Sequence, residues 1–392
     1  MWRGLNARGL VVRAHRWIGL ALGALFALMG LTGSFNVYHR ELDAWLNPAY
    51  YQASAGLPTV SVDEAVARVR ARDPRLGVLN IALPTDGHPY WIWFRNERLA
   101  GGAPGRQFQM AVDPHTGATV GPRLAWGGVS LTREALARTV YRLHYELWAG
   151  PVGKTAVGLL GVFLFLSLGL GLALWWPRRG AWRHALIVKR GATGARAAFD
   201  WHRAGGAWFA AALAMLAFSG TYMVFPEYFH TAASPLGAVD DLKAEVRAAG
   251  GRHVVTLEDA ARLARTRFPD GEVRFISPAR GATGAIRVRL FRPGEANEFG
   301  RTFVWLDPAG GAVLRAIDGR GPSAAARFFN AQFPLHNGSI AGPAGRAIVF
   351  ITGFMPFLLF VTGVIVWRAK RRTVRTHANG APRSAKAMTS IA

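Results

Sequence analysis

Four long apolar segments constrain this 392-residue chain more than any other feature. Each is about 20 residues long and contains no Asp, Glu, Lys or Arg, and a helix of that length crosses the roughly 30 Å hydrocarbon core of a bilayer. The first segment follows basic residues, as in a signal peptide, but its apolar run is too long for one, so we expect an uncleaved helix. We therefore predict four transmembrane helices, at residues 17–37, 156–176, 204–225 and 347–367.

The two halves of the chain repeat one another. A shift of 187 residues, from His15 to His202, also superimposes residues 31–33 on residues 218–220. A shift of 192 residues superimposes His144 on His336, and Gly171 on Gly363. Because both halves enter the membrane from the same side, we predict a parallel repeat about an axis along the membrane normal.

The basic residues predict the orientation of the chain. The formal net charge of +24 would suggest a nucleic-acid partner in a soluble protein. Here Lys and Arg gather in short segments before the first apolar run, between the second and third, and after the fourth. Such segments stay in the cytoplasm. We expect cytoplasmic termini, periplasmic connections at residues 39–143 and 226–336, and no nucleic-acid partner. Because the chain has no cysteine, it has no disulfide and no iron–sulfur cluster.

The two long connections read as similar small modules. Ser61 with Glu64, and Thr256 with Asp259, have the spacing of helix N-caps. Alternating apolar residues predict strands at 77–83, 88–95, 107–112, 272–276, 286–291 and 302–306. The predicted fold is an integral membrane protein, mainly α, with four transmembrane helices in a parallel two-fold repeat and two periplasmic α+β modules.

The predicted domain boundaries follow from these features. They are the first transmembrane helix (1–43), the first module (44–140), the second helix (141–178), a basic cytoplasmic loop (179–200), the third helix (201–228), the second module (229–330), the fourth helix (331–370) and a basic cytoplasmic tail (371–392).

The parallel repeat predicts two facing pairs of histidines. Equivalent residues lie at the same depth on opposite sides of the axis, so His15 should face His202 near the cytoplasm, and His144 should face His336 near the periplasm. Haem iron takes two axial ligands from opposite faces of its ring. Each pair therefore predicts one haem, although zinc or copper would also accept such ligands.

Further residues complete the predicted haem sites. Arg16 and Arg203 stand next to the inner histidines and are candidate partners for the haem propionates. His39 and His230 are reserve ligands for the outer haem. No dinucleotide-binding motif is present, so we expect the electron donor to be a quinol or a separate cytoplasmic reductase.

Several motifs resemble a known family. Residues 13–20, 31–34, 39–43 and 47–48 resemble the opening of the PepSY-associated transmembrane proteins, and residues 112–117 and 306–308 resemble PepSY domains. That family includes iron-regulated proteins of the bacterial inner membrane, a siderophore reductase among them. The resemblance implies two bis-histidine b-type haems that carry electrons to ferric siderophores in the periplasm, without identifying the siderophore. Two other functions stay open: a non-enzymatic membrane anchor whose modules bind or inhibit a periplasmic partner, and a carrier for the siderophore or its iron.

Overall fold

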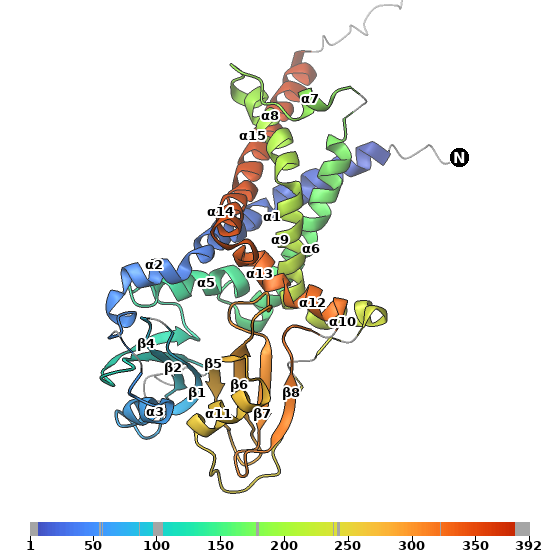
Figure 1. The fold of residues 1–392 in the computed structure, drawn as a ribbon. Coiled ribbons are helices and arrows are strands. Elements are labelled where there is room, and N and C mark those ends of the chain that lie inside the picture. Colours follow the sequence, from blue (N-terminus) through green and yellow to red (C-terminus); the bar gives the residue numbers. More distant parts are fainter. Residues whose placement is uncertain are drawn as a thin grey trace, which may run out of the picture. The chain divides into compact units, whose positions relative to one another are not determined.

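The computed structural model describes residues 7–54, 56, 58–85, 87–96, 105–177, 180–237, 239–240, 244–321 and 323–380 (Figure 1). The predicted cytoplasmic residues Arg3, Arg178 and Arg179, and the tail after residue 380, lie outside the described residues. The chain divides into two compact units. The helical unit comprises the described residues of Met1–Leu31, Val162–Ala214 and Thr352–Ala392, and the sheet unit comprises those of Thr32–Gly161 and Met215–Ile351.

Three helical segments are long and apolar enough to cross a membrane. They are α1 (Ala7–Val37), α6 (Gly150–Trp175) and Ser339–Arg372, which contains α14 (Gly342–Gly353) and most of α15 (Met355–Gly380). They contain three of the four predicted apolar runs, except for Trp176 at the end of one run. Of the predicted membrane helices, these three are present as long helical segments.

The third predicted membrane helix, in contrast, is broken. Residues 204–225 are divided between α8 (Gly194–Trp208) and α9 (Ala210–Val224), which are bent by 63°. Gly205 and Gly206 come just before the break, and glycine pairs are poor helix formers that commonly mark kinks. The described residues therefore give three spans, or four if the bent pair is one span.

Close packing holds the helical unit together. Helix α8 packs along α15. Gly30 of α1 meets the backbone carbonyl of Gly353, so closely that a Cβ at residue 30 would clash with it. Small residues at such contacts let helix backbones approach in a bilayer, where no hydrophobic effect drives helices together. The short helix α7 (Trp182–Ala185) also belongs to this unit.

One antiparallel sheet organises the other unit, with the strand order β4-β3-β2-β1-β5-β6-β7-β8. The first half contributes β1 (Gly77–Ala82), β2 (Tyr90–Arg95), β3 (Gln107–Val112) and β4 (Thr119–Trp126). The second half contributes β5 (Glu272–Ser277), β6 (Ile286–Phe291), β7 (Thr302–Leu306) and β8 (Val313–Ile317). The predicted strands are confirmed to within two residues at their ends.

The two halves meet where β1 pairs with β5, through Ile81 opposite Ile276. The sequence predicts two separate outer modules, one per half, but the two halves share one sheet and one hydrophobic core. A separate four-stranded module would leave β1 or β5 as an exposed edge with unpaired backbone groups, and their pairing removes that edge.

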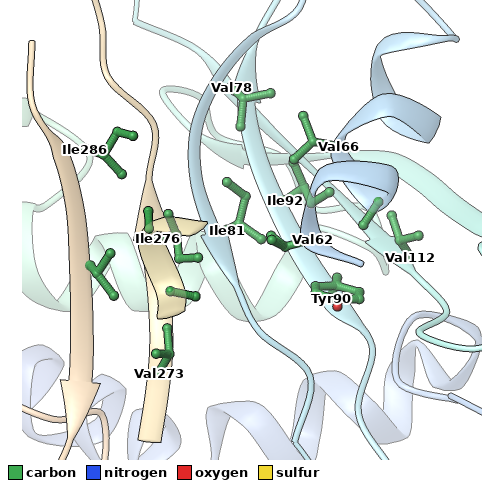
Figure 2. Close-up of a cluster of buried hydrophobic side chains, with 14 of the residues drawn as sticks. Val62, Val66, Val78, Ile81, Tyr90, Ile92, Val112, Val273, Ile276 and Ile286 are labelled. Carbon is green, nitrogen blue, oxygen red and sulfur yellow. The ribbon is translucent and has the colours of Figure 1, made fainter. Parts of the chain in front are cut away.

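Helices α3 (Val62–Arg70) and α11 (Leu257–Arg267) supply the helical side of this core. Figure 2 shows Val62 and Val66 of α3 in a cluster with Ile81, Ile92 and Ile276 of the sheet. The capping box at Ser61 and the cap at Thr256 are confirmed.

The remaining helices of the sheet unit are short. They are α2 (His39–Leu46), η1 (Pro48–Tyr50), α5 (Leu136–Glu146), α10 (Pro226–Ala233), η2 (Ser234–Leu236), α12 (Ala324–Asn330), α13 (Gln332–Asn337) and η3 (Ser339–Ala341). A buried ion pair ties α2 to the sheet, because Arg123 of β4 donates to both carboxylate oxygens of Asp43.

Candidate functional site

The helical unit brings His15 of α1 and His202 of α8 face to face. Their ring centroids are 6.1 Å apart, and the ring planes make an angle of 78°. Imidazole nitrogens bind transition metals at about 2 Å, so two rings that share one metal ion have centroids about 6 Å apart. The spacing of this inner pair therefore fits two ligands of a single metal.

Hydrogen bonds fix which nitrogen of each inner histidine is protonated. Nδ1 of His15 lies 3.0 Å from the carbonyl oxygen of Ser167, and Nδ1 of His202 lies 3.0 Å from that of Leu359. A carbonyl only accepts, so both Nδ1 atoms carry the proton and the lone pair is at Nε2. Such contacts orient metal-binding histidines and raise the basicity of the nitrogen that binds the metal.

The sheet unit contains a second pair with the same spacing. The centroids of His144 of α5 and His336 of α13 are also 6.1 Å apart, with a ring angle of 51°. Nδ1 of His144 is 3.2 Å from the hydroxyl of Thr32, and Nδ1 of His336 is 2.9 Å from the hydroxyl of Ser219. The Ser219 hydroxyl donates to the carbonyl of Met215, so it accepts from His336. His336 therefore also has its lone pair at Nε2.

A glycine faces the ring of each paired histidine. A Cβ at Gly171 would lie 3.0 Å from Cε1 of His15, and one at Gly363 would lie 3.4 Å from Cε1 of His202. In the outer pair, a Cβ at Gly33 would lie 3.0 Å from Cε1 of His144, and one at Gly220 would lie 3.2 Å from Cε1 of His336. The same ring-on-glycine contact thus occurs four times. A Cβ at residue 33, 171 or 220 would press against the ring, whereas one at residue 363 would make an ordinary van der Waals contact.

The chemistry of the donors narrows what each pair could hold. In the described part of the chain, no group of three or more His, Asp or Glu residues is placed to bind a metal ion. A pair can supply two ligands, so the other positions of a six-coordinate ion would come from the bound group itself. A haem provides four nitrogens in one plane and takes the two histidines as axial ligands.

The two arginines next to the inner histidines, Arg16 and Arg203, differ in their contacts. Arg16 is exposed on α1. Nη2 of Arg203 donates to the carbonyls of His184 and Ile187, at 2.6 and 3.1 Å, and lies 3.3 Å from a carboxylate oxygen of Asp200. Arg203 therefore ties the loop after α6 to α8, a role that the sequence did not suggest.

The reserve histidines have other contacts. His39 packs against Tyr141 with ring centroids 5.6 Å apart, and its Nδ1 lies 2.8 Å from the carbonyl of Asn36. Nε2 of His230 lies 3.1 Å from the hydroxyl of Tyr222. The structure thus brings the four principal histidines into pairs and holds the reserve histidines against tyrosines.

The hydrogen-bond partners and facing glycines of the paired rings were not predicted from the sequence. Thr32 and Ser219 occupy matched positions of the repeat, as do Gly171 and Gly363, but no role follows from the match alone. The sequence does contain one relevant pattern: Thr32 and Ser219 each precede a glycine that is repeated in the other half.

The described residues form apolar helices long enough to cross a membrane, together with one antiparallel sheet. These features and the two histidine pairs define a membrane protein with two candidate cofactor sites. Residues 12–370 match the family described as the PepSY-associated TM region, and the chain belongs to that family. No curated protein matches the chain.

Proposed function

We propose that this protein is a di-haem b reductase of the bacterial inner membrane that passes electrons to ferric siderophores in the periplasm. The observation that carries the proposal is the presence of two histidine pairs with the same centroid spacing of 6.1 Å. His15 and His202 hold one haem, and His144 and His336 hold the other. A bound haem supplies one-electron chemistry at a potential set by its ligands and surroundings.

The proposed membrane arrangement counts α8 and α9 as one span. The chain then crosses four times as a parallel repeat, with both termini in the cytoplasm and the sheet unit in the periplasm. The distribution of Lys and Arg among the short connections supports this orientation. The inner pair then lies near the cytoplasmic donor, a quinol or a reductase, and the outer pair lies near the periplasmic acceptor.

The residues around each histidine pair fix the orientation of its rings, which suits a site for electron transfer. The carbonyls of Ser167 and Leu359, and the hydroxyls of Thr32 and Ser219, hold the rings in one orientation. Because each pair would supply two histidine ligands, a bound haem would have no open position for oxygen or substrate. This arrangement favours electron transfer over chemistry at the iron.

Release of iron follows from the electron alone. Siderophores hold ferric iron through hard oxygen ligands, and one electron converts it to the softer ferrous ion, which these ligands bind less well. No bond of the siderophore breaks, so no nucleophile is required. A ferric siderophore is too bulky to enter between the helices, so it would meet the protein at the sheet unit.

A sided reduction assay tests this function. Spheroplasts and inverted vesicles that contain the protein are reduced without oxygen, then given a membrane-impermeant ferric siderophore and a chromogenic ferrous chelator. We expect haem reoxidation with matching ferrous chelate in spheroplasts only, and neither in membranes that lack the protein. Haems that stay reduced across a panel of siderophores would refute the proposed acceptor, and activity in inverted vesicles only would refute the orientation.

A further inference from the structure

Two polar side chains beside the outer histidine pair lack partners. Both amide atoms of Asn36, at the end of α1, are buried without a hydrogen bond, as is Nε of Arg138 on α5. Among the described residues, no carboxylate lies within ion-pair distance of Arg138. Each unsatisfied buried polar group costs about 1–3 kcal/mol, and a charged group costs more. Burial lowers the pKa of Arg138 to about 10, so its guanidinium is still charged at neutral pH.

The contacts of His39 place these groups together. His39 packs against Tyr141 of α5 and reaches the carbonyl of Asn36. Burial lowers the pKa of His39, with a smaller contribution from the nearby charge of Arg138. The end of α1, the start of α2 and helix α5 therefore surround one polar region.

This polar region adjoins the outer histidine pair. Asn36 follows Thr32 by four residues and Gly33 by three, so it lies on the face of α1 that contacts His144. On α5, Arg138 precedes Tyr141 by three residues, and Tyr141 precedes His144 by three. Both elements thus carry the unpartnered groups within about two helical turns of His144.

Nearby acids do not satisfy Arg138. Burial lowers the pKa of Arg138, whereas the charge of the Asp43 carboxylate raises it. That carboxylate, however, accepts hydrogen bonds from both Nη atoms of Arg123, at 2.8 and 3.1 Å. It also accepts hydrogen bonds from Tyr51 and Asn47. The charge of Asp43 is therefore already compensated.

The matched region of the second half supplies its own partners. The shift of 192 residues places Asn330 at the position of Arg138, and Asn330 accepts from Nε of Arg301 and donates to the carbonyl of Gly319. His230, the reserve histidine of this half, meets the hydroxyl of Tyr222. At this matched position, the second half therefore has partners of its own.

We propose that Arg138 and Asn36 bind the carboxylates of the haem held by His144 and His336. This inference rests on the proposed function. A b-type haem carries two propionates on one edge, which match a guanidinium and an amide on one side of the ligand pair. The same contacts fix which edge of the haem faces the first half of the chain.

The test uses full-length protein with His15→Ala and His202→Ala, which leaves only the outer site. Apoprotein is titrated with haem and with haem dimethyl ester, which has no free carboxylate. We expect at least about tenfold tighter binding of free haem, the scale of outer contacts at metal sites. Arg138→Met should abolish this preference and Arg138→Lys should keep part of it. Arg133→Met, which changes an exposed arginine nearby, should leave it unchanged.

A second variant separates this role from a structural one. Asn36→Leu removes a buried amide that lacks a partner, so the thermal stability of the apoprotein should stay the same or rise, while haem affinity falls. A loss of apoprotein stability with unchanged haem affinity would show a structural role and overturn the inference.

The remaining outcomes are distinguishable. Normal haem uptake with no preference for free carboxylates would overturn this inference alone. If Arg138→Met lost bound phosphatidylglycerol but kept the preference, the anion at Arg138 would be a lipid headgroup and the inference would be wrong. No haem uptake by the outer site in any variant, with none by the wild type, would instead refute the proposed function.

Discussion

Replacing either His144 or His336 with alanine is expected to reduce the haem content of the purified protein from two per chain to one. The centroids of the two rings are 6.1 Å apart, and in the proposed site both rings would ligate one haem iron, so removal of either ring would leave that iron with a single histidine ligand. His15→Ala and His202→Ala should each remove the other haem. Haem per chain, measured from reduced-minus-oxidised spectra, checks all four variants.

The reserve histidines serve as matched controls. His39→Ala and His230→Ala change histidines of the same unit that contact tyrosines, and both should keep two haems. If His39→Ala removed one haem while His336→Ala kept both, the outer ligand assignment would be wrong and His39 would replace His336.

Arg123→Leu is expected to destabilise the sheet unit by about 3–5 kcal/mol, because it leaves a buried carboxylate without its cation. The side chains of Arg123 and Asp43 are only 1% and 4% exposed. The guanidinium also lies over the rings of Tyr50 and Trp91, at 4.5 and 4.9 Å. Denaturant unfolding followed by tryptophan fluorescence measures the loss.

An exposed pair in the same unit provides the control. Arg75 is 78% exposed beside Asp73, so Arg75→Leu should change stability by less than about 1 kcal/mol. Equal effects of Arg75→Leu and Arg123→Leu would contradict the role assigned to the buried pair.

The same pair makes the stability of the sheet unit depend on pH. Burial opposes ionisation of Asp43, but the charge and hydrogen bonds of Arg123, with those of Tyr51 and Asn47, hold its pKa below the usual value. Its contribution is therefore complete above the unfolded pKa of about 4 and is lost as pH falls through the lower, folded pKa. Arg123→Leu removes the charge of Arg123 that lowers the pKa of Asp43. A fall in pH should therefore not cause the same loss of stability in this variant.

Much of the sheet unit could be predicted because its signals are local. Ser61 with Glu64 forms the predicted capping box, and alternation of apolar residues locates strands such as Gln107–Val112. The pairing of β1 with β5 could not be predicted, because the alternation of a strand shows which face is buried but not which strand lies beside it. Ile81 and Ile276 are adjacent only after both halves have folded.

The helical parts show a similar limit. The apolar composition of residues 204–225 predicts a membrane-spanning helix. Composition does not show where a helix bends, so the break at Phe209 could not be predicted. The repeat led to both histidine pairs, although their role as haem ligands stays a prediction. The role of Arg203 as a partner of a haem propionate also stays a prediction. Its contacts with His184 and Ile187 could not be predicted, because they depend on a loop whose path the sequence does not specify.

The most direct test of the central claim is the haem content and spectrum of the purified wild-type protein. A reduced-minus-oxidised visible spectrum combined with protein quantification gives the number, type and spin state of the haems. We expect two low-spin, six-coordinate b-type haems per chain, because in the proposed sites each pair would supply both protein ligands of one iron. Protein that contains no haem after expression with ample iron and haem precursor, or a single haem that survives loss of either pair, would contradict the account.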